Sequence, residues 1–202
     1  MVFNDIENIV CFTPGTLIST AKGAVPVQDL KVGDKVITRD NGLQTIRWVG
    51  AKTMEGRHLL DNQHLRPILI RKGSLGRDLP ERDMKVSPNH RMLVANERTS
   101  LLFEEREVLV AAKHLIDHKG IQQIDVVGTT YIHMLFDHHE VILADGAWSE
   151  SFQPGDYSLK GMGNSQRNEI FEIFPELRDA KGRNGYGAAR RSLKRSEARL
   201  LR

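Results

Sequence analysis

The first 155 residues consist largely of short apolar and β-branched runs, separated by turns rich in Gly, Pro, Asn and Asp. Short runs that end at turn-forming residues are typical of strands. The pair Asn41-Gly42 lies between two such runs and is a strong signal for a hairpin. We predict strands at residues 23–27, 30–34, 36–38, 44–49, 67–70, 92–94, 126–127, 130–132 and 140–143. Short, irregularly spaced strands indicate a mainly β fold, such as a compact barrel or curved sandwich.

Helical periodicity is weaker in this part of the chain and becomes clearer after Gly155. The residues Ile170, Phe171 and Phe174 fall on one face of a helix that Pro175 ends. We predict helices at residues 109–118, 165–174 and 188–201, and a loop at residues 182–187. The C-terminal segment has too few apolar residues for a core of its own. We therefore expect a leader at residues 1–7, a β domain at 8–155 and a basic helical tail at 156–202 that packs on this domain.

Charge is distributed unevenly along the chain. Residues 176–202 carry nine Lys or Arg and three acidic residues, a net charge of +6, whereas residues 1–175 carry −3. A basic segment can bind nucleic acid or an anionic surface. Only one aromatic residue, Tyr186, accompanies the basic run, so bases would find little to stack on. We therefore expect the tail to lie against the acidic body, and we do not expect a nucleic acid partner.

Composition excludes several other classes of protein. One cysteine in 202 residues rules out a disulfide framework. No apolar stretch has the length of a membrane span. The acidic start Met1-Val2-Phe3-Asn4-Asp5 lacks the basic region of a secretory signal, which predicts a cytoplasmic protein or export by another route. The pair His114 and His118 has a spacing that could hold a metal, but no third ligand is evident, so we predict neither a metal nor a cofactor.

The single cysteine, Cys11, is a candidate nucleophile. It precedes a turn at Pro14-Gly15 and the β-branched run that follows the turn. A thiol near a base and an oxyanion site can attack a carbonyl carbon. Its place at the start of the first strand suggests that the attacked bond is the chain's own, Val10–Cys11. The alternative is that Cys11 is a small buried hydrophobic residue.

Three stretches together resemble the Hint domains, the autoprocessing fold that hedgehog proteins and inteins share. The first is Cys-Phe-Thr-Pro-Gly-Thr at 11–16, followed by Asp-Leu-Lys-Val-Gly-Asp-Lys-Val at 29–36. The second is Val-Ser-Pro-Asn-His-Arg-Met-Leu at 86–93, similar to a Thr-x-x-His motif with Ser87 in the Thr position. The third runs from Tyr131 to Gly146 and is similar to the last strands of the fold. The resemblance spans about residues 8–155 and is strongest to bacterial, hedgehog-like members with a short helical tail.

This resemblance implies a reaction in which the Cys11 thiolate attacks the carbonyl carbon of Val10. The peptide bond becomes a thioester, and water or a small nucleophile then opens it. The motif position of His90 implies that this residue protonates the leaving amine. Ser87 would orient His90 or donate to the oxyanion, or it is an ordinary turn former.

The last part of the resemblance implies two further candidates. His139 would polarise the scissile carbonyl, or it packs across strands. Asp137 is a candidate base for Cys11. The substrate would be the chain's own N-terminal segment, in a single-turnover reaction.

The sequence departs from the splicing members of the family. Inteins end with a His-Asn pair, and the Asn side chain cyclises to release the downstream segment. The corresponding stretch here, residues 146–152, contains no Asn. We therefore expect N-terminal cleavage without splicing. Two alternatives stay open: a cysteine hydrolase that acts on an external substrate, and a non-catalytic module retained for export or partner binding.

Overall fold

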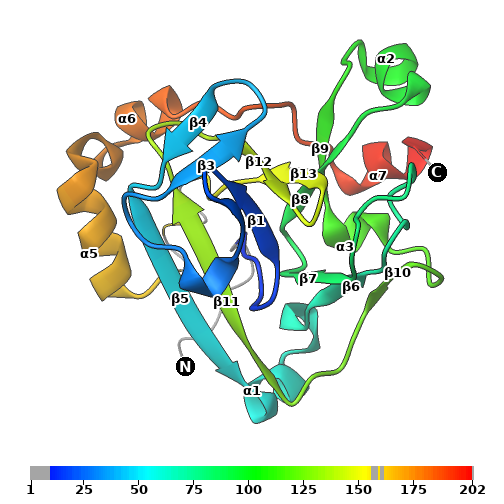
Figure 1. Cartoon of the computed structure of the whole chain (residues 1–202), viewed down its shortest axis with the longest axis horizontal. Coiled ribbons are helices and arrows are strands. Elements are labelled where there is room, and N and C mark those ends of the chain that lie inside the picture. The colour runs from blue at the N-terminus through cyan, green and yellow to red at the C-terminus, as the bar shows by residue number, and fades with distance from the viewer. Residues whose placement is uncertain (1–9, 156–158, 160–161, 202) are drawn as a thin grey trace.

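The computed structural model describes residues 10–155, 159 and 162–201. The leader predicted at residues 1–7 lies outside the described residues. Within the described part, the strands form three sheets (Figure 1). The largest has eight strands, in the order β2-β1-β3-β12-β13-β8-β9 with β4 paired to β3. Its strands are β1 (Leu17–Thr20), β2 (Gly23–Pro26), β3 (Lys35–Thr38), β4 (Gly42–Thr45), β8 (Arg91–Val94), β9 (Val108–Ala111), β12 (Val141–Ala144) and β13 (Ala147–Glu150).

The two smaller sheets have three strands and two strands. One has the order β10-β6-β7, with β6 (Ile68–Ile70), β7 (Met84–Val86) and β10 (Ile121–Gln123). The other pairs β5 (Trp48–Glu55) with β11 (Gly128–Leu135). Their eight-residue antiparallel register runs from Trp48 opposite Leu135 to Glu55 opposite Gly128. In Figure 1 this pair runs along one side of the molecule, and α1 (Gly56–Asp61) lies at its end.

Phe12 connects the two smaller sheets. It forms antiparallel bridges with Val86, at the end of β7, and with Ile132, in β11. Its side chain is buried in the main hydrophobic core with Ile18, Ile68, Ile70, Met92, Met134 and Ile142. Burial alternates along β1, β3, β5, β6 and β7, as expected for strands with one face against this core.

A glycine, Gly50, leaves room for two aromatic rings on the buried face of the β5–β11 pair. Trp48, Gly50 and Met54 are buried on the inward side of β5, and His133 lies opposite Gly50 in the register. The indole of Trp48 stacks on the ring of His133, with ring centroids 5.2 Å apart. A Cβ atom at Gly50 would lie 2.1 Å from a ring carbon of Trp48 and 2.7 Å from His133 Nε2. The two rings therefore occupy the space that any other residue at position 50 would fill.

The helices lie outside the sheets. They are α2 (Glu97–Phe103), α3 (Ala112–Leu115), α5 (Asn164–Ile173), α6 (Ala180–Gly185) and α7 (Arg195–Ala198), with short 3₁₀ turns at 27–29, 63–65, 175–178 and 199–201. In Figure 1, α2 projects from the tip of the β8–β9 hairpin, and α5 lies beside β5. Across the described residues, each helix falls short of the length and apolar character that a bilayer crossing requires.

The C-terminal segment packs on the β domain. Ile170, Phe174, Leu177 and Tyr186 form a cluster with Trp48, Leu135 and Phe152. The hydroxyl of Tyr186 donates to the carbonyl of Phe136 at 2.8 Å. Further on, the chain runs beside β9. The Leu109 amide donates to the Arg191 carbonyl, and the Leu193 amide donates to the Leu109 carbonyl, both at 2.9 Å.

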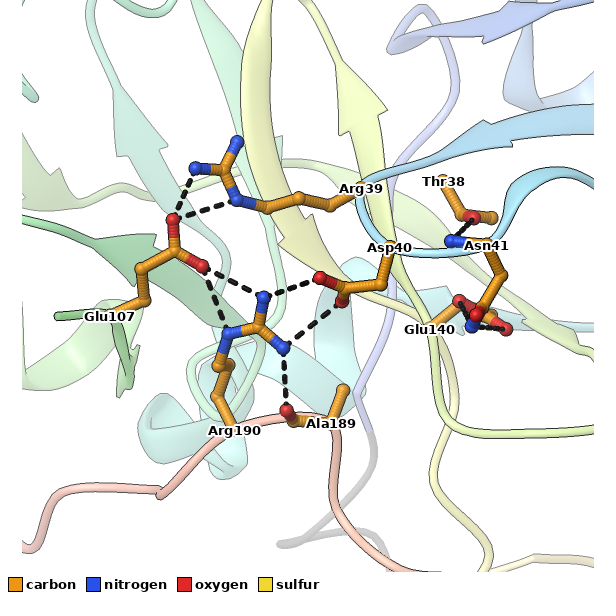
Figure 2. A network of polar contacts seen from close by, with 8 residues as sticks. All are labelled: Thr38, Arg39, Asp40, Asn41, Glu107, Glu140, Ala189 and Arg190. Atoms are coloured by element: carbon orange, nitrogen blue, oxygen red, sulfur yellow. Dashed lines mark hydrogen bonds and ion pairs between the residues drawn. The ribbon is translucent and has the colours of Figure 1, made fainter. Parts of the chain in front are cut away.

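Charged residues hold the same segment in place (Figure 2). The Arg190 guanidinium donates to both carboxylate oxygens of Asp40, at 2.7 and 3.0 Å, and to Glu107 at 2.9 Å. Arg39 binds the same Glu107 carboxylate from the other side. Planar guanidinium groups suit such bidentate contacts. The basic tail thus meets acidic groups of the β domain.

The mainly β prediction is confirmed, but several local predictions differ from the structure. Residues 30–34 form a turn in which Gly33 has a φ of 96°, not a strand. The helix predicted at 109–118 is wrong in its first part, because 108–111 form the fully buried strand β9. Residues 182–187 are largely helical, in α6. In the helix predicted at 188–201, pairing with β9 keeps the first residues extended, so α7 is confined to 195–198.

The packing at Gly50 leads to a first prediction. Gly50→Ala should lower the free energy of unfolding by roughly 1–3 kcal/mol, because the added methyl group overpacks the space between Trp48 and His133. Urea unfolding followed by Trp fluorescence measures this change. Gly187→Ala is the matched control, since a Cβ at that position meets nothing within 4 Å. Equal stability of the two variants would contradict this account of the inner face.

Candidate functional site

The register around Phe12 fixes the position of Cys11. Phe12 and Ile132 exchange two backbone hydrogen bonds, of 2.8 and 2.9 Å. In an antiparallel pair this places residue 11 opposite residue 133. On the other side, the Ser87 amide donates to the Cys11 carbonyl at 2.9 Å. Cys11 therefore lies between β11 and the end of β7, and its side chain is 1% exposed.

His133 is the side chain that meets the thiol. Its Nδ1 atom lies 3.0 Å from Cys11 Sγ, within hydrogen-bond distance for sulfur. The ring is buried between Trp48 and Phe152, with centroids 5.2 and 5.3 Å away. Burial lowers the pKa of His133 to about 4, because the low-dielectric surroundings disfavour the imidazolium. The ring is therefore neutral at neutral pH and can accept the thiol proton.

Sequence reasoning did not assign His133 a role. The available signal was the strand alternation at 131–135, which places His133 on the same face as Tyr131 and Leu135. A histidine at an inward position of a strand calls for a partner, because its polar ring is costly to bury alone. The partner became visible only through the pairing of Phe12 with Ile132, which joins segments 120 residues apart.

Ser87 contacts the backbone nitrogen of Cys11. Its Oγ atom accepts a hydrogen bond from the Cys11 amide at 2.9 Å, and Ser87 is itself buried. The turn at Pro88-Asn89 follows, and the His90 amide donates to the Ser87 carbonyl at 3.0 Å. A hydroxyl in this place accepts from the Cys11 amide and can also donate, since a hydroxyl does both.

His90 is fully buried next to the same segment. Its ring packs edge-on against the ring of Phe12, with centroids 4.3 Å apart. Both ring nitrogens lack a hydrogen-bond partner within the part of the chain that the structure describes. Burial lowers the pKa of His90 to about 4, although the carboxylate of Glu150 opposes the shift. The ring is neutral at neutral pH and carries one N–H that is available for donation.

His139 contacts the C-terminal segment. Its Nδ1 atom accepts a hydrogen bond from the Ala189 amide at 3.0 Å, and its Nε2 atom lies 3.3 Å from a carboxylate oxygen of Glu150. Glu150 is fully buried and also accepts hydrogen bonds from the backbone and the guanidinium of Arg91, both at 2.8 Å. These contacts bring His139 to the tail and to Glu150, not to Cys11.

Asp137 lies on the surface. Its carboxylate is 3.5 Å from the Arg47 guanidinium, and its side chain is 54% exposed. It follows β11 and lies four residues beyond His133, which is about 13 Å of extended chain. Of the five predicted site residues, the structure thus brings Cys11, Ser87 and His90 into one neighbourhood, and it places His139 and Asp137 elsewhere.

A small pocket opens beside the thiol. Its volume is about 20 Å³, and its lining includes Cys11, Lys52, His64, Tyr131 and His133. That volume accommodates roughly one water molecule. Burial raises the pKa of the Cys11 thiol well above its usual value, and the positive charge of Lys52 opposes this shift. Among the described residues, no three His, Cys, Asp or Glu side chains come together as a metal site.

Comparison with known proteins identifies the family. The family model of the Hint domain matches residues 10–156. No curated protein matches the chain. Among solved structures, a bacterial intein-like domain from Clostridium thermocellum is 17% identical with a TM-score of 0.46, and the match covers 70% of this chain and 98% of that one.

A DnaB intein from Synechocystis sp. PCC 6803 is 12% identical, with a TM-score of 0.45 and coverage of 71% of this chain and 99% of that one. The gp41-1 intein is 11% identical, with a TM-score of 0.40 and coverage of 69% and 97%. These likenesses are too distant to assign a role to any residue. The family model, in contrast, matches well over half of the chain. The chain therefore belongs to the Hint domain family and has the capacity for self-processing that characterises such domains.

Proposed function

We propose that this Hint domain cleaves its own chain before Cys11, by an N–S acyl shift that forms a thioester, and that it does not splice. The observation that carries the proposal is the 3.0 Å contact between Cys11 Sγ and Nδ1 of a buried His133. A thiol beside a neutral imidazole is an activated nucleophile. The bond under attack is the adjacent Val10–Cys11 peptide, whose nitrogen is held by Ser87.

The first step moves the thiol proton to His133. The Nδ1 lone pair accepts it, so the neutral ring carries its own hydrogen on Nε2. The resulting thiolate attacks the carbonyl carbon of Val10. Electrons of the carbonyl bond move to the oxygen, which becomes the oxyanion of a tetrahedral intermediate.

The second step breaks the bond between the Val10 carbonyl carbon and the Cys11 nitrogen. This nitrogen must gain a proton as it leaves, because an amide anion is a poor leaving group. The Ser87 hydroxyl contacts it directly. The proposed proton source is His90: its N–H gives the proton to this nitrogen while its other ring nitrogen takes up a proton from water, and the His133 imidazolium returns its proton to water, so that both rings end neutral. The net change is a thioester at Sγ and a free α-amine on Cys11, with the thiol proton of Cys11 balanced by the proton gained at nitrogen.

Water then opens the thioester and releases the upstream segment as a carboxylate, and the thiol is restored. The pocket beside Cys11 has space for a nucleophile of this size, about 20 Å³. Cys11 is only 1% exposed, which argues against the alternative of a cysteine hydrolase, because an external peptide would have to reach the sulfur. A non-catalytic module is the remaining alternative, and the contact between Cys11 and His133 is unexpected for it.

The absence of splicing is inferred from the residues after β13. The stretch at 151–155 is Ser-Phe-Gln-Pro-Gly and contains no Asn. Without an Asn side chain that cyclises, the downstream segment stays attached. In this respect the chain resembles the hedgehog-like members of the family.

Reporter domains fused to both ends of the full chain test this proposal. The upstream reporter should be released by added thiol or hydroxylamine, because a thioester is far more electrophilic than an amide. Intact mass measures the products. Cys11→Ala should abolish release, since the chain has no other thiol. The downstream reporter should stay attached in every case. A ligated product of the two reporters would contradict the proposal.

The role of His133 gives a separate prediction. His133→Gln should slow thioester formation by about a hundredfold to ten-thousandfold, the usual range for loss of a general base. The exposed neighbour His138 offers a matched control, and His138→Gln should process at the normal rate. The rates come from reporter release at saturating thiol. Equal rates in the two variants would exclude His133 as the base.

The pH dependence follows from the low pKa of His133. Because this pKa is about 4, the ring stays neutral as the pH falls through about 6.5, where an ordinary histidine gains its proton. The rate of thioester formation should therefore hold through this range and fall only as the pH approaches about 4. A decline centred near pH 6.5 would contradict the assignment.

The control for this profile is the folded state. Unfolding exposes His90 and His133, which then take up protons below about pH 6.5, so stability decreases from there toward pH 4. Circular dichroism at each pH separates loss of fold from loss of the base.

A further inference from the structure

Lys52 occupies an unusual position in its strand. Burial alternates along β5, so that Gly50, Lys52 and Met54 face inward, while Ala51 and Thr53 are exposed. Lysine is rarely buried unless a partner compensates its charge. The side chain of Lys52 is nevertheless partly buried, opposite Tyr131 in the register of β5 with β11.

The partner that Lys52 faces is the reactive centre. Lys52 and Cys11 line the same pocket, and Lys52 is the only lysine or arginine among the described residues that do so. The other titratable groups that face Cys11 there are Tyr131 and His133 from β11 and His64 from the 3₁₀ turn at 63–65. The Tyr131 hydroxyl donates to the Leu65 carbonyl at 2.6 Å, so its proton is already engaged.

The chemistry of the site creates a need for positive charge. Proton transfer from Cys11 to His133 leaves a thiolate in a pocket that Met54 and Leu65 help to line. A buried anion is costly unless it is paired. The imidazolium of His133 supplies one counter-charge. A second cation would further stabilise the thiolate and the oxyanion that forms from it, until the oxyanion collapses to the neutral thioester. A lysine ammonium is a compact cation of this kind.

We propose that the ammonium group of Lys52 stabilises the Cys11 thiolate, and with it the first step of the proposed self-cleavage, on which this inference rests. Lys52 is thus a positioning residue that acts through Cys11. The direction of its influence on the thiol agrees with this assignment, since its charge favours the ionised form. The flexible stem of lysine allows the charge to follow the thiolate as the bond to Val10 forms.

The test compares three variants of the full chain. Lys52→Met keeps the length of the side chain and removes its charge, and Lys52→Arg keeps the charge. Lys85→Met is the matched control, because Lys85 is exposed on β7, two residues before Ser87. Hydrogen peroxide, which is close to water in size, reports the thiolate by oxidising it. The thiol that remains is counted after unfolding, and Cys11 is the only one in the chain.

In Lys52→Met, the rate of Cys11 oxidation and the rate of thioester formation should each fall by roughly tenfold or more relative to the native chain. Lys52→Arg should recover most of both rates, and Lys85→Met should equal the native chain. Unchanged oxidation of Lys52→Met would overturn the proposal. If Lys52→Arg were as slow as Lys52→Met, the proposal would also be overturned. The effect of Lys52 would then come from the packing of its side chain and not from its charge.

These outcomes are distinct from failure of the proposed function. The oxidation rate depends on the thiolate and needs no cleavage. If the native chain formed no thioester while Lys52→Met still slowed oxidation, the self-cleavage would be wrong and the pairing of Lys52 with Cys11 would stand.

Discussion

The backbone pairing of Phe12 with Ile132 is the interaction on which the site depends. Two hydrogen bonds, of 2.8 and 2.9 Å, fix the register between the N-terminal segment and β11. Because side chains alternate along a strand, this register decides which residues meet. A shift by one residue would turn Cys11 away from His133 and would remove Phe12 from the core. Packing and chemistry therefore select the same alignment, and the buried ring of Phe12 keeps the thiol in place.

Burial shapes the acid–base properties of Cys11, His90 and His133. It lowers the pKa of His90 and His133 and raises that of Cys11, so all three groups are neutral at neutral pH. Neutral groups suit the proposed self-cleavage, in which one proton moves from sulfur to an imidazole and another reaches the amine. Each charge that forms during the reaction then carries a desolvation penalty, because it forms in the low-dielectric interior. A partly buried lysine beside Cys11 reduces this cost, because its positive charge stabilises the thiolate. The same lysine on the outer face of β5 would be too far from Cys11 to do so.

How far the sequence predicted the molecule depended on the range of the interactions involved. The hairpin at Asn41-Gly42 is local, and β3 and β4 pair around it as predicted. The motif with Ser87 and His90 is also local, and both residues lie beside the Cys11 segment. His133 was missed because its role depends on a pairing between distant segments. The helix predicted at 109–118 failed for a similar reason: a segment that is apolar throughout is ambiguous until its neighbours are known, and pairing with β8 makes it a strand.

The contacts of the charged C-terminal segment likewise depend on residues that are distant in the sequence. Its basic residues predict contact with the acidic body, but the sequence does not say which acidic groups are involved. In the structure, Arg190 lies between Asp40 and Glu107, and Arg191 pairs with Glu197 at 2.8 Å and lies over the Phe103 ring. These arginines hold the segment against β9, where the Ala189 amide reaches His139. His139 in turn approaches Glu150, whose carboxylate opposes the lowering of the His90 pKa. A segment far from Cys11 in sequence thereby contributes to the surroundings of His90, which packs against Phe12 next to Cys11. It does so through packing and not through contact with Cys11 itself.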